Sequence, residues 1–256
     1  MIKLLTIIGA RPQIIKSAAI NRAVQNKYSN SIKEVIVHTG QHYDQNMSEV
    51  FFDEMNIPKP DYNLGVGSGS HGVQTARMIE GIEDLLLKEK PDYINLYGDT
   101  NSTLAGAVAA SKLNIPIVHV EAGLRSFNRT MPEEINRITC DHLSTLLFSP
   151  TKTGFNNLVR EGFNPENKSP FTPENPGIFH CGDVMYDNSL YFAELASQKS
   201  TILEDVGVKD SEFILATVHR DHNTDNPQKL SQIFEAFLEI AQKYKIALPL
   251  HPRTLK

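Results

Sequence analysis

The sequence contains little cysteine, no cluster of basic residues and no long apolar run, and each of these absences excludes a class of protein. Two cysteines among 256 residues, Cys140 and Cys181, do not make a disulfide framework, so we expect a cytoplasmic protein in a reducing environment. The net charge is −5 and lysines and arginines form no block, which argues against a nucleic-acid partner, because such binding needs clustered cations that neutralise phosphates. The apolar runs have only the length of strands, so we expect no membrane partner.

The composition that is present is typical of a globular protein. Hydrophobic residues make up 40% of the chain and charged residues 21%, which is enough apolar surface for a sizeable core. Short apolar runs predict strands over 4–8, 34–38, 93–97, 117–120, 146–149 and 177–181. Longer amphipathic stretches predict helices over 12–28, 71–90, 103–113, 132–143, 152–161 and 183–198. This alternation predicts an α/β fold of parallel βαβ units with right-handed crossovers.

A polar stretch over 200–211 predicts a domain boundary. We expect a Rossmann-like N-terminal domain over 1–199 and the beginning of a second Rossmann-like domain over 200–256. The second part shows only two apolar runs, 213–218 and 247–250, with one helical pattern over 227–244 between them. Because two strands are too few to close a second sheet, we expect a chain that is truncated at its C-terminal end.

Polar side chains follow the predicted strands at their carboxyl ends, which is where doubly wound folds bind ligands. The candidate site residues in this pattern are Arg11, Lys16, Gln41, His42, Asp99, Glu121, Arg125, Glu133, Arg137, His219 and Arg220. Capping and helix dipoles explain single members: Glu133 or Glu134 in a first helical turn is by itself an ordinary dipole partner. They do not explain carboxylates, histidines and arginines at successive strand ends. A shared cleft for an anionic ligand is therefore the better interpretation.

Two common kinds of site lack their sequence signature. Neither GxGxxG nor GxxxxGK[ST] follows a predicted strand, so nothing supports a nicotinamide or P-loop site, and we expect no cofactor. The histidines lack a ligand spacing such as HExxH, so we expect no metal.

Six segments then carry a resemblance to a known family. In chain order they are Gly9-Ala-Arg-Pro-Gln-Ile-Ile-Lys16, Thr39-Gly-Gln-His42, Gly98-Asp-Thr-Asn-Ser-Thr103, His119-Val-Glu-Ala-Gly-Leu-Arg125, Met131-Pro-Glu-Glu-Ile-Asn-Arg137 and Thr217-Val-His-Arg220. Together they resemble the non-hydrolysing UDP-N-acetylglucosamine 2-epimerase family, whose fold is the GT-B arrangement of two Rossmann-like domains. Within the family, residues 124–133 and 248–253 are most similar to the branch that acts on UDP-2,3-diacetamido-2,3-dideoxyglucuronate.

The resemblance implies an isomerase that inverts C2 of a UDP-2-acetamido sugar by eliminating UDP and adding it back through a 2-acetamidoglucal. It implies catalytic roles for Asp99, Glu121, Glu133 and His219. The expected substrate-binding residues are Arg11, Lys16, Gln41, His42, Arg125, Arg137 and Arg220. Among these polar partners, Arg11, Lys16 and His219 are the candidates for contacts to the diphosphate or leaving group, whereas Arg125 and Arg137 are expected to orient carboxylates.

The resemblance also implies properties of the whole protein. Relatives are commonly homodimers and are expected to serve surface-polysaccharide synthesis in the cytoplasm. They continue with a further acidic, Gly/Ser-containing motif that grips the uridine, ribose and diphosphate, and this sequence lacks that motif. We therefore expect the chain by itself to bind the UDP-sugar poorly and to turn over little.

Two other classes of function stay open at the level of sequence. A GT-B glycosyltransferase would share the fold and the nucleotide sugar but would transfer the sugar without a change at C2. A non-catalytic nucleotide-sugar binding module would bind without turnover. Exchange of the C2 proton with solvent distinguishes the epimerase from both.

Overall fold

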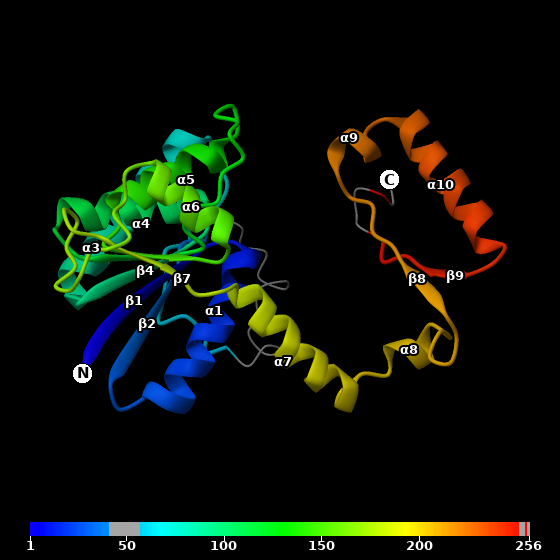
Figure 1. Ribbon diagram of the computed structural model, residues 1–256, viewed down its shortest axis with the longest axis horizontal. Helices are drawn as coiled ribbons and strands as arrows, with labels where there is room; N and C mark the ends of the chain where they lie inside the picture. Colours follow the sequence, from blue (N-terminus) through cyan, green and yellow to red (C-terminus); the bar gives the residue numbers. More distant parts are fainter. Residues whose placement is uncertain (41–56, 251–253, 255–256) are drawn as a thin grey trace. The chain divides into compact units, whose positions relative to one another are not determined.

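The computed structural model describes residues 1–40, 57–250 and 254, which form two compact units, Met1–Tyr191 and Phe192–Lys256 (Figure 1). The division falls within helix α7 (Val184–Lys199). The domain boundary at 199/200 stays a prediction. None of the helices in the described ranges has both the length and the apolar character needed to cross a membrane.

The first unit is built on a parallel sheet with strand order β3-β2-β1-β4-β5-β6-β7. The strands are β1 (Ile2–Ile8), β2 (Ile32–His38), β3 (Tyr62–Asn63), β4 (Tyr93–Tyr97), β5 (Ile117–Val120), β6 (Leu146–Ser149) and β7 (Gly177–His180). Every neighbouring pair in this sheet is parallel. The predicted α/β class with a Rossmann-like parallel sheet is confirmed. The prediction missed β3, because two residues are too few to show a periodic pattern.

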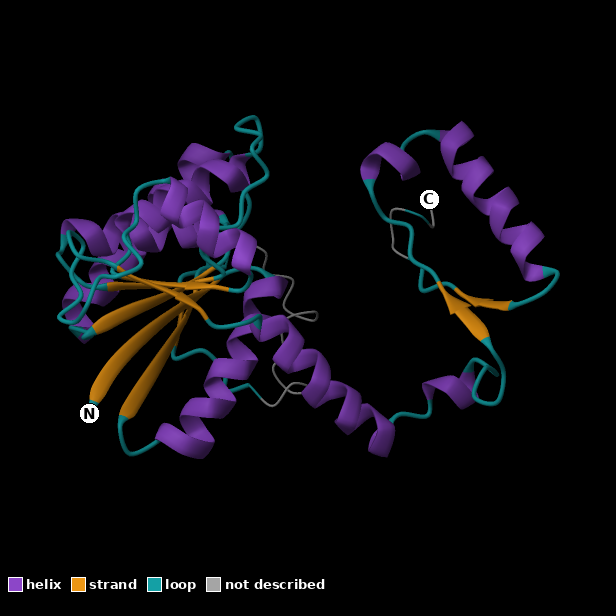
Figure 2. Ribbon diagram, viewed as in Figure 1, coloured by secondary structure: helices purple, strands orange, loops and turns teal. Residues whose placement is uncertain are grey.

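Helices cover both faces of this sheet (Figures 1 and 2). They are α1 (Arg11–Ala23), α3 (His71–Glu89), α4 (Asn101–Lys112), α5 (Pro132–Leu143), α6 (Lys152–Arg160) and the first half of α7. A π-helical turn, η1 (Val24–Tyr28), follows α1 and accounts for the longer helix that the sequence predicted. In Figure 1, α3, α4 and α5 lie on one face of the sheet, and α1 and α7 lie on the other. Asn188 of α7 donates from Nδ2 to the carbonyl oxygen of Ile15 at 2.7 Å and so attaches α7 to α1.

The main core lies between the middle of the sheet and helices α3, α4 and α5. Strands β1 and β4 contribute completely buried aliphatic side chains, and α3 adds Met78 and Ile82. Helix α4 faces them with alanines, whose small side chains allow the helix to lie close to the sheet. Helix α4 begins at Asn101, four positions after the end of β4, and this packing fixes the start of the helix against the sheet. The core thereby determines where the polar residues between β4 and α4 lie.

The second unit contains a smaller parallel sheet of two strands, β8 (Phe213–Leu215) and β9 (Lys245–Ala247). Its helices are α8 (Ile202–Asp205), α9 (Asp221–Thr224) and α10 (Pro227–Ala241). Asn226 caps α10 by accepting hydrogen bonds from the backbone N–H groups of Gln228 and Lys229, both at 3.1 Å. Both strands are shorter than predicted, and β9 begins two residues earlier than the predicted strand at 247–250 and overlaps it only at Ala247.

Candidate active site

The strand order creates a crevice at the carboxyl ends of β1 and β4. The chain leaves β1 toward β2 on one side, while β4 and β5 lie on the other side, so the loops after β1 and β4 turn to opposite faces of the sheet. Gln13 of α1 connects these two loops. Its Oε1 accepts from the N–H of Gly9 at 2.9 Å, and its Nε2 donates to the carbonyl oxygen of Tyr97 at 3.0 Å. A buried side-chain amide thus connects the end of β1 to the end of β4.

Two carboxylates and two cations form a connected cluster at this edge of the sheet. Arg137 of α5 forms ion pairs through Nη2 with Asp99 Oδ2 and, at 3.4 Å, with Glu121 Oε1. Lys16 of α1 forms an ion pair through Nζ with the other oxygen of Glu121. Burial works against the positive charge of Arg137, but Asp99 and then Glu121 outweigh it and raise the pKa of that guanidinium. The cluster is therefore held together by charges from four separate segments: α1, the turn after β4, the turn after β5, and α5.

The backbone at Glu121 is unusual for a residue with a side chain. Glu121 follows β5 directly and has a φ of +75°, a left-handed conformation that costs about 1 kcal/mol for a residue other than glycine. Arg137 Nη1 donates to the carbonyl oxygen of Glu121 at 3.0 Å, and the N–H of Glu121 donates to Phe148 at 3.0 Å. These contacts hold the turn that aims the Glu121 carboxylate at Lys16. Strain of this kind is typical of functional sites.

Glu133 and Glu134 have opposite surroundings although they are neighbours in the first turn of α5. Glu134 is buried and accepts hydrogen bonds from the N–H and hydroxyl of Ser126, at 2.8 and 3.0 Å, and from the N–H of Phe127 at 3.0 Å. Burial opposes the charge of Glu134, but these bonds outweigh it and lower the pKa of the carboxyl group. Glu133 is exposed to solvent and lines the cleft beside Asp99. Glu134 thus holds the preceding loop, which leaves Glu133 as the candidate for chemistry.

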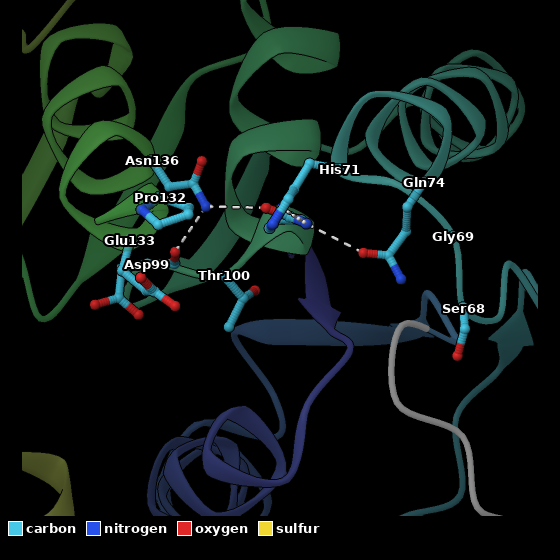
Figure 3. A pocket seen from close by; sticks show the side chains of 10 residues that line it. Ser68, Gly69, His71, Gln74, Asp99, Thr100, Pro132, Glu133 and Asn136 are labelled. Atoms are coloured by element: carbon cyan, nitrogen blue, oxygen red, sulfur yellow. Dashed lines mark hydrogen bonds between the residues drawn. The ribbon is translucent and has the colours of Figure 1, made fainter. Parts of the chain in front are cut away.

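A cleft of about 380 Å³ opens in front of Asp99 and Glu133. Its lining residues come from the N-terminal ends of α3, α4 and α5 and from the segment before α3; they are Ser68, Gly69, His71, Gln74, Asp99, Thr100, Asn101, Pro132, Glu133 and Asn136. Figure 3 shows the two carboxylates at one end of this cleft and Gln74 and Ser68 at the other. A ladder of amides crosses its wall: Asn136 donates to Asn101 Oδ1 at 3.2 Å, and Asn101 donates to Gln74 Oε1 at 3.1 Å.

The same ladder fixes the residue that carries the first carboxylate. Asn136 Nδ2 also donates to the carbonyl oxygen of Asp99 at 2.9 Å. At Gly98, just before Asp99, φ is +62°, and a Cβ there would lie 3.4 Å from Lys16 Nζ. A side chain at position 98 would therefore strain the turn, and its Cβ would be in van der Waals contact with Lys16.

Arg125 lies behind the cluster and pairs with other carboxylates. It donates from Nε and Nη2 to Glu161 at 2.7 and 2.6 Å, and Nη2 also pairs with Asp141 Oδ2 at 2.7 Å. Burial opposes its charge, but the bonds to Glu161 and the charge of Asp141 raise the pKa of Arg125. Arg125 therefore pairs with Asp141 and Glu161 rather than with the candidate catalytic carboxylates, and its expected role in orienting carboxylates stays a prediction.

The structure brings together six of the candidates named from the sequence and leaves the others elsewhere. Those gathered at the carboxyl edge of the first unit's sheet are Lys16, Asp99, Glu121, Arg125, Glu133 and Arg137. Arg11 is exposed in the first turn of α1, at the same edge of the sheet. Gln41 and His42 lie outside the described residues. His219 and Arg220 belong to the second unit, where Nδ1 of His219 lies 3.3 Å from Thr217 Oγ1.

Gln13, Asn101 and Asn136 stand within the motifs of the sequence, but the sequence pattern indicates no role for them. Each is buried and each forms hydrogen bonds that fix a loop of the site. The signal in the sequence was that these three amides stand in the same short segments as the charged site residues. A buried amide without a hydrogen-bond partner is costly, so an amide in such a segment is expected to bond to the neighbouring loop. Across the described parts of the chain, no group of three or more histidines, cysteines and carboxylates could hold a metal ion.

Comparison with known proteins yields consistent matches. The sequence model of a family described as UDP-N-acetylglucosamine 2-epimerase matches residues 24–256. A UDP-N-acetylglucosamine 2-epimerase homolog of Methanococcus maripaludis is 52% identical over 255 residues, covering 99% of this chain and 67% of the relative. The UDP-2,3-diacetamido-2,3-dideoxy-D-glucuronate 2-epimerase of Pseudomonas aeruginosa is also 52% identical, covering 98% and 67%. The crystal structure of the Methanocaldococcus jannaschii UDP-GlcNAc 2-epimerase, in complex with UDP-GlcNAc and UDP, is similar with a TM-score of 0.80 and 44% identity, covering 99% and 67%.

Proposed function

Because the chain belongs to the UDP-N-acetylglucosamine 2-epimerase family, we propose that it is an isomerase that inverts C2 of a UDP-2-acetamido sugar. The reaction interconverts sugars of the UDP-N-acetylglucosamine and UDP-N-acetylmannosamine types. The observation that carries this proposal is the placement of three carboxylates, Asp99, Glu121 and Glu133, at one edge of one sheet together with Lys16 and Arg137. Carboxylates supply the acid and base, and cations stabilise the leaving diphosphate.

Inversion at C2 is difficult because the proton on that carbon is not acidic. In the proposed reaction, a carboxylate takes the C2 proton, the electron pair of the C2–H bond forms a C1=C2 double bond, and the C1–O bond to the diphosphate breaks. The products of this step are UDP and a 2-acetamidoglucal. Re-addition of UDP to C1, with protonation of C2 from the opposite face, gives the epimer. Asp99, Glu121 and Glu133 share these proton transfers and the stabilisation of positive charge at C1.

The two cations of the cluster have different roles in the proposed reaction. Arg137 contacts both Asp99 and Glu121, so its role is to orient the two carboxylates. Lys16 contacts Glu121 alone among the three carboxylates, and Arg11 lies in the first turn of the same helix, so both are suited to the diphosphate. If Arg11→Ala leaves the affinity for the UDP-sugar unchanged, the diphosphate role of Arg11 is wrong.

The remaining roles extend the proposal beyond the first unit. His219 is proposed to contact the leaving group, and Arg220, Gln41 and His42 to contact the substrate. We also propose that the protein works in the cytoplasm as a homodimer and serves the synthesis of a surface polysaccharide. The chain spans about two thirds of the length of the curated relatives that it matches.

Two substrates of the same reaction type are supported by relatives of equal identity. The Methanococcus maripaludis relative is named as a homolog of UDP-N-acetylglucosamine 2-epimerase, and the Pseudomonas aeruginosa relative acts on the diacetamido-glucuronate nucleotide. The similarity of residues 124–133 and 248–253 to the second branch favours the diacetamido-glucuronate sugar. The carboxylate cluster serves either substrate, since both carry an acetamido group on C2.

Breakage of the C1–O bond can be tested with UDP-N-acetylglucosamine that carries ¹⁸O in the bridge between C1 and the β-phosphorus. Once this bond breaks, the bridging oxygen becomes one of three equivalent oxygens of the terminal phosphate of UDP. We expect ³¹P NMR to show the label moving into non-bridging positions while the epimer forms. Epimer formation with all of the label still in the bridge would contradict the elimination.

A further inference from the structure

The loops that carry Asp99 and Glu121 are joined by a buried histidine for which the proposed chemistry has no use. His119 lies in β5, two residues before Glu121, and its side chain is completely buried. Its Nδ1 lies 2.7 Å from Asp141 Oδ1, and its Nε2 lies 2.8 Å from the carbonyl oxygen of Gly98. The ring thus spans from α5 to the residue directly before Asp99.

Both partners of the ring are hydrogen-bond acceptors. A carbonyl oxygen can only accept, and a buried carboxylate at 2.7 Å from a protonated nitrogen accepts as well. A neutral imidazole has a single N–H group and would leave one of the two acceptors facing a lone pair. The imidazolium satisfies both. With Asp141 ionised, as the lowered pKa of its carboxyl group indicates, this geometry favours a positive charge on His119.

The surrounding charges act in the same direction. Burial alone would lower the pKa of His119, but the Cys140 thiol and the Asp141 carboxylate outweigh it and raise the pKa to about 10. Two further charged groups act on Asp141: Arg125, in the loop after β5, forms an ion pair with it, and Arg137 of α5 interacts with it through its charge. Asp141 is completely buried, and His119 is first among the charges that lower its pKa against the effect of burial. The ion pair persists across the neutral range.

Asp141, which holds the His119 ring, also binds the loop that begins at Glu121. Its Oδ2 accepts from the N–H of Gly123 at 3.1 Å and pairs with Arg125. On the other side, the N–H of Gly98 donates to Val120 at 3.0 Å, so the two strand ends are also bonded directly. Gly98 also lies close to the charged atoms of the cluster, because a Cβ built on it would stand 3.4 Å from Lys16 Nζ and 3.8 Å from Glu121 Oε2.

We propose that His119 is a positioning residue: a permanently protonated imidazolium, anchored on Asp141, that holds the Gly98 carbonyl and so keeps Asp99 in register with Glu121. The effect on turnover rests on the proposed function, because it assumes that Asp99 and Glu121 carry the proton transfers. The charge state of His119 does not rest on it and can be measured without substrate.

The charge is tested first, by ¹⁵N NMR of the chain with labelled histidine at pH 8. We expect one of the nine histidines to have both ring nitrogens protonated, and His119→Gln to remove that signal. A His119 ring with one unprotonated nitrogen at pH 8 would overturn the proposal, whether or not the chain proves to be an epimerase.

The positioning role is tested by His119→Gln, which keeps one amide donor, with His142→Gln as the matched control. His142 lies on the same helix as Asp141 but is half-exposed, with Nε2 3.5 Å from Glu161. For the folded fraction, measured by near-UV circular dichroism, we expect His119→Gln to lower kcat for C2 exchange by up to roughly 100-fold, with KM within about 3-fold of wild type. His142→Gln should leave both unchanged.

A merely structural histidine would reduce the amount of folded protein without changing kcat per folded molecule, and that result would overturn the proposal. If His119→Gln does not fold, Asp141→Asn provides the same test, because it removes the carboxylate while keeping the shape of the side chain. An active wild type with unchanged kcat in both variants would contradict the positioning role alone. An inactive wild type with a doubly protonated His119 would instead contradict the proposed function.

Discussion

At the scale of single residues, Glu133 and Glu134 show how two adjacent and identical side chains acquire different roles. The backbone of α5 turns Glu134 inward, where three donors from Ser126 and Phe127 surround its carboxylate, and turns Glu133 toward the cleft. The local sequence pattern could not separate them, because both occupy the first turn of a helix, where a carboxylate is ordinary; only the resemblance to the family selected Glu133. The difference arises because the loop at Ser126 and Phe127 folds back onto Glu134. No local sequence pattern predicts this contact.

This difference predicts opposite outcomes for two matched substitutions. Glu134→Gln should lower the free energy of unfolding by about 1–3 kcal/mol, because neutral Gln cannot accept charge-assisted bonds from three donors. Glu133→Gln should change that free energy by less than about 0.5 kcal/mol, since the side chain is exposed, yet lower kcat by roughly 10²- to 10⁴-fold. Urea unfolding and C2 exchange measure the two quantities. A Glu133→Gln protein with wild-type kcat would contradict the catalytic role.

The buried charge of His119 predicts how stability depends on pH. A pKa raised from the usual 6.5 to about 10 in the folded protein means that the native state binds a proton that the unfolded state releases. The stabilisation from that proton is fully present below about pH 6.5 and is lost as the pH rises through about 10. The gap in unfolding free energy between wild type and His119→Gln should therefore narrow steadily between these values. A gap that is constant from pH 6 to pH 10 would contradict a charged His119.

At the scale of elements, the strands and helices are predicted best where they pack against a dense core. There, burial of one face produces a clear periodicity of apolar residues in the sequence. The bounds of β4, β5, β6 and α5 agree with the expectation to the residue, because each is a short apolar run or an amphipathic stretch bounded by glycine, proline or polar residues. Elements near the edges of the sheets fit less well. The two residues of β3 show no pattern, and β9 lies over Lys245–Ala247 rather than the apolar run at 247–250.

The turn after β5 predicts a strong effect from a single methyl group. Gly123 has a φ of +80°, and a Cβ there would lie 2.3 Å from the carbonyl oxygen of Gly154 in α6. Gly182 has a similar φ of +88°, but a Cβ there would meet nothing within 4 Å. Both Gly→Ala variants bear the cost of a left-handed alanine, about 1 kcal/mol. Gly123→Ala should cost several kcal/mol more, on the order of an overpacked core site, because backbone must move.

Thermal unfolding of the two glycine variants, at equal protein concentration, checks this prediction. Gly182→Ala is the control for backbone strain, so the difference between the variants isolates the contact with Gly154. Equal melting temperatures would mean that α6 does not pack against the turn after β5 as described, and the anchoring of the loop that carries Glu121 would have to be reconsidered.

At the scale of the whole molecule, the strand order explains why residues from distant segments meet. Parallel strands present their carboxyl ends at one edge, so Lys16, Asp99, Glu121 and Arg137, spread over more than a hundred positions, converge there. This convergence could be predicted from the sequence, because the βαβ alternation implies it. The pairings within the cluster could not, since which cation meets which carboxylate depends on helix packing and on the left-handed turn at Glu121.

The most direct test of the account is proton NMR of the chain in D₂O with UDP-N-acetylglucosamine and, separately, with the diacetamido-glucuronate nucleotide, without added NAD. We predict that deuterium enters C2 of one of these sugars as the manno epimer appears, slowly for the chain by itself. We also predict that Asp99→Asn, Glu121→Gln and Glu133→Gln each suppress the exchange while Glu134→Gln, in its folded fraction, retains it. Release of UDP with no deuterium at C2, or exchange that survives all three carboxylate substitutions, would contradict the proposed role of the cluster.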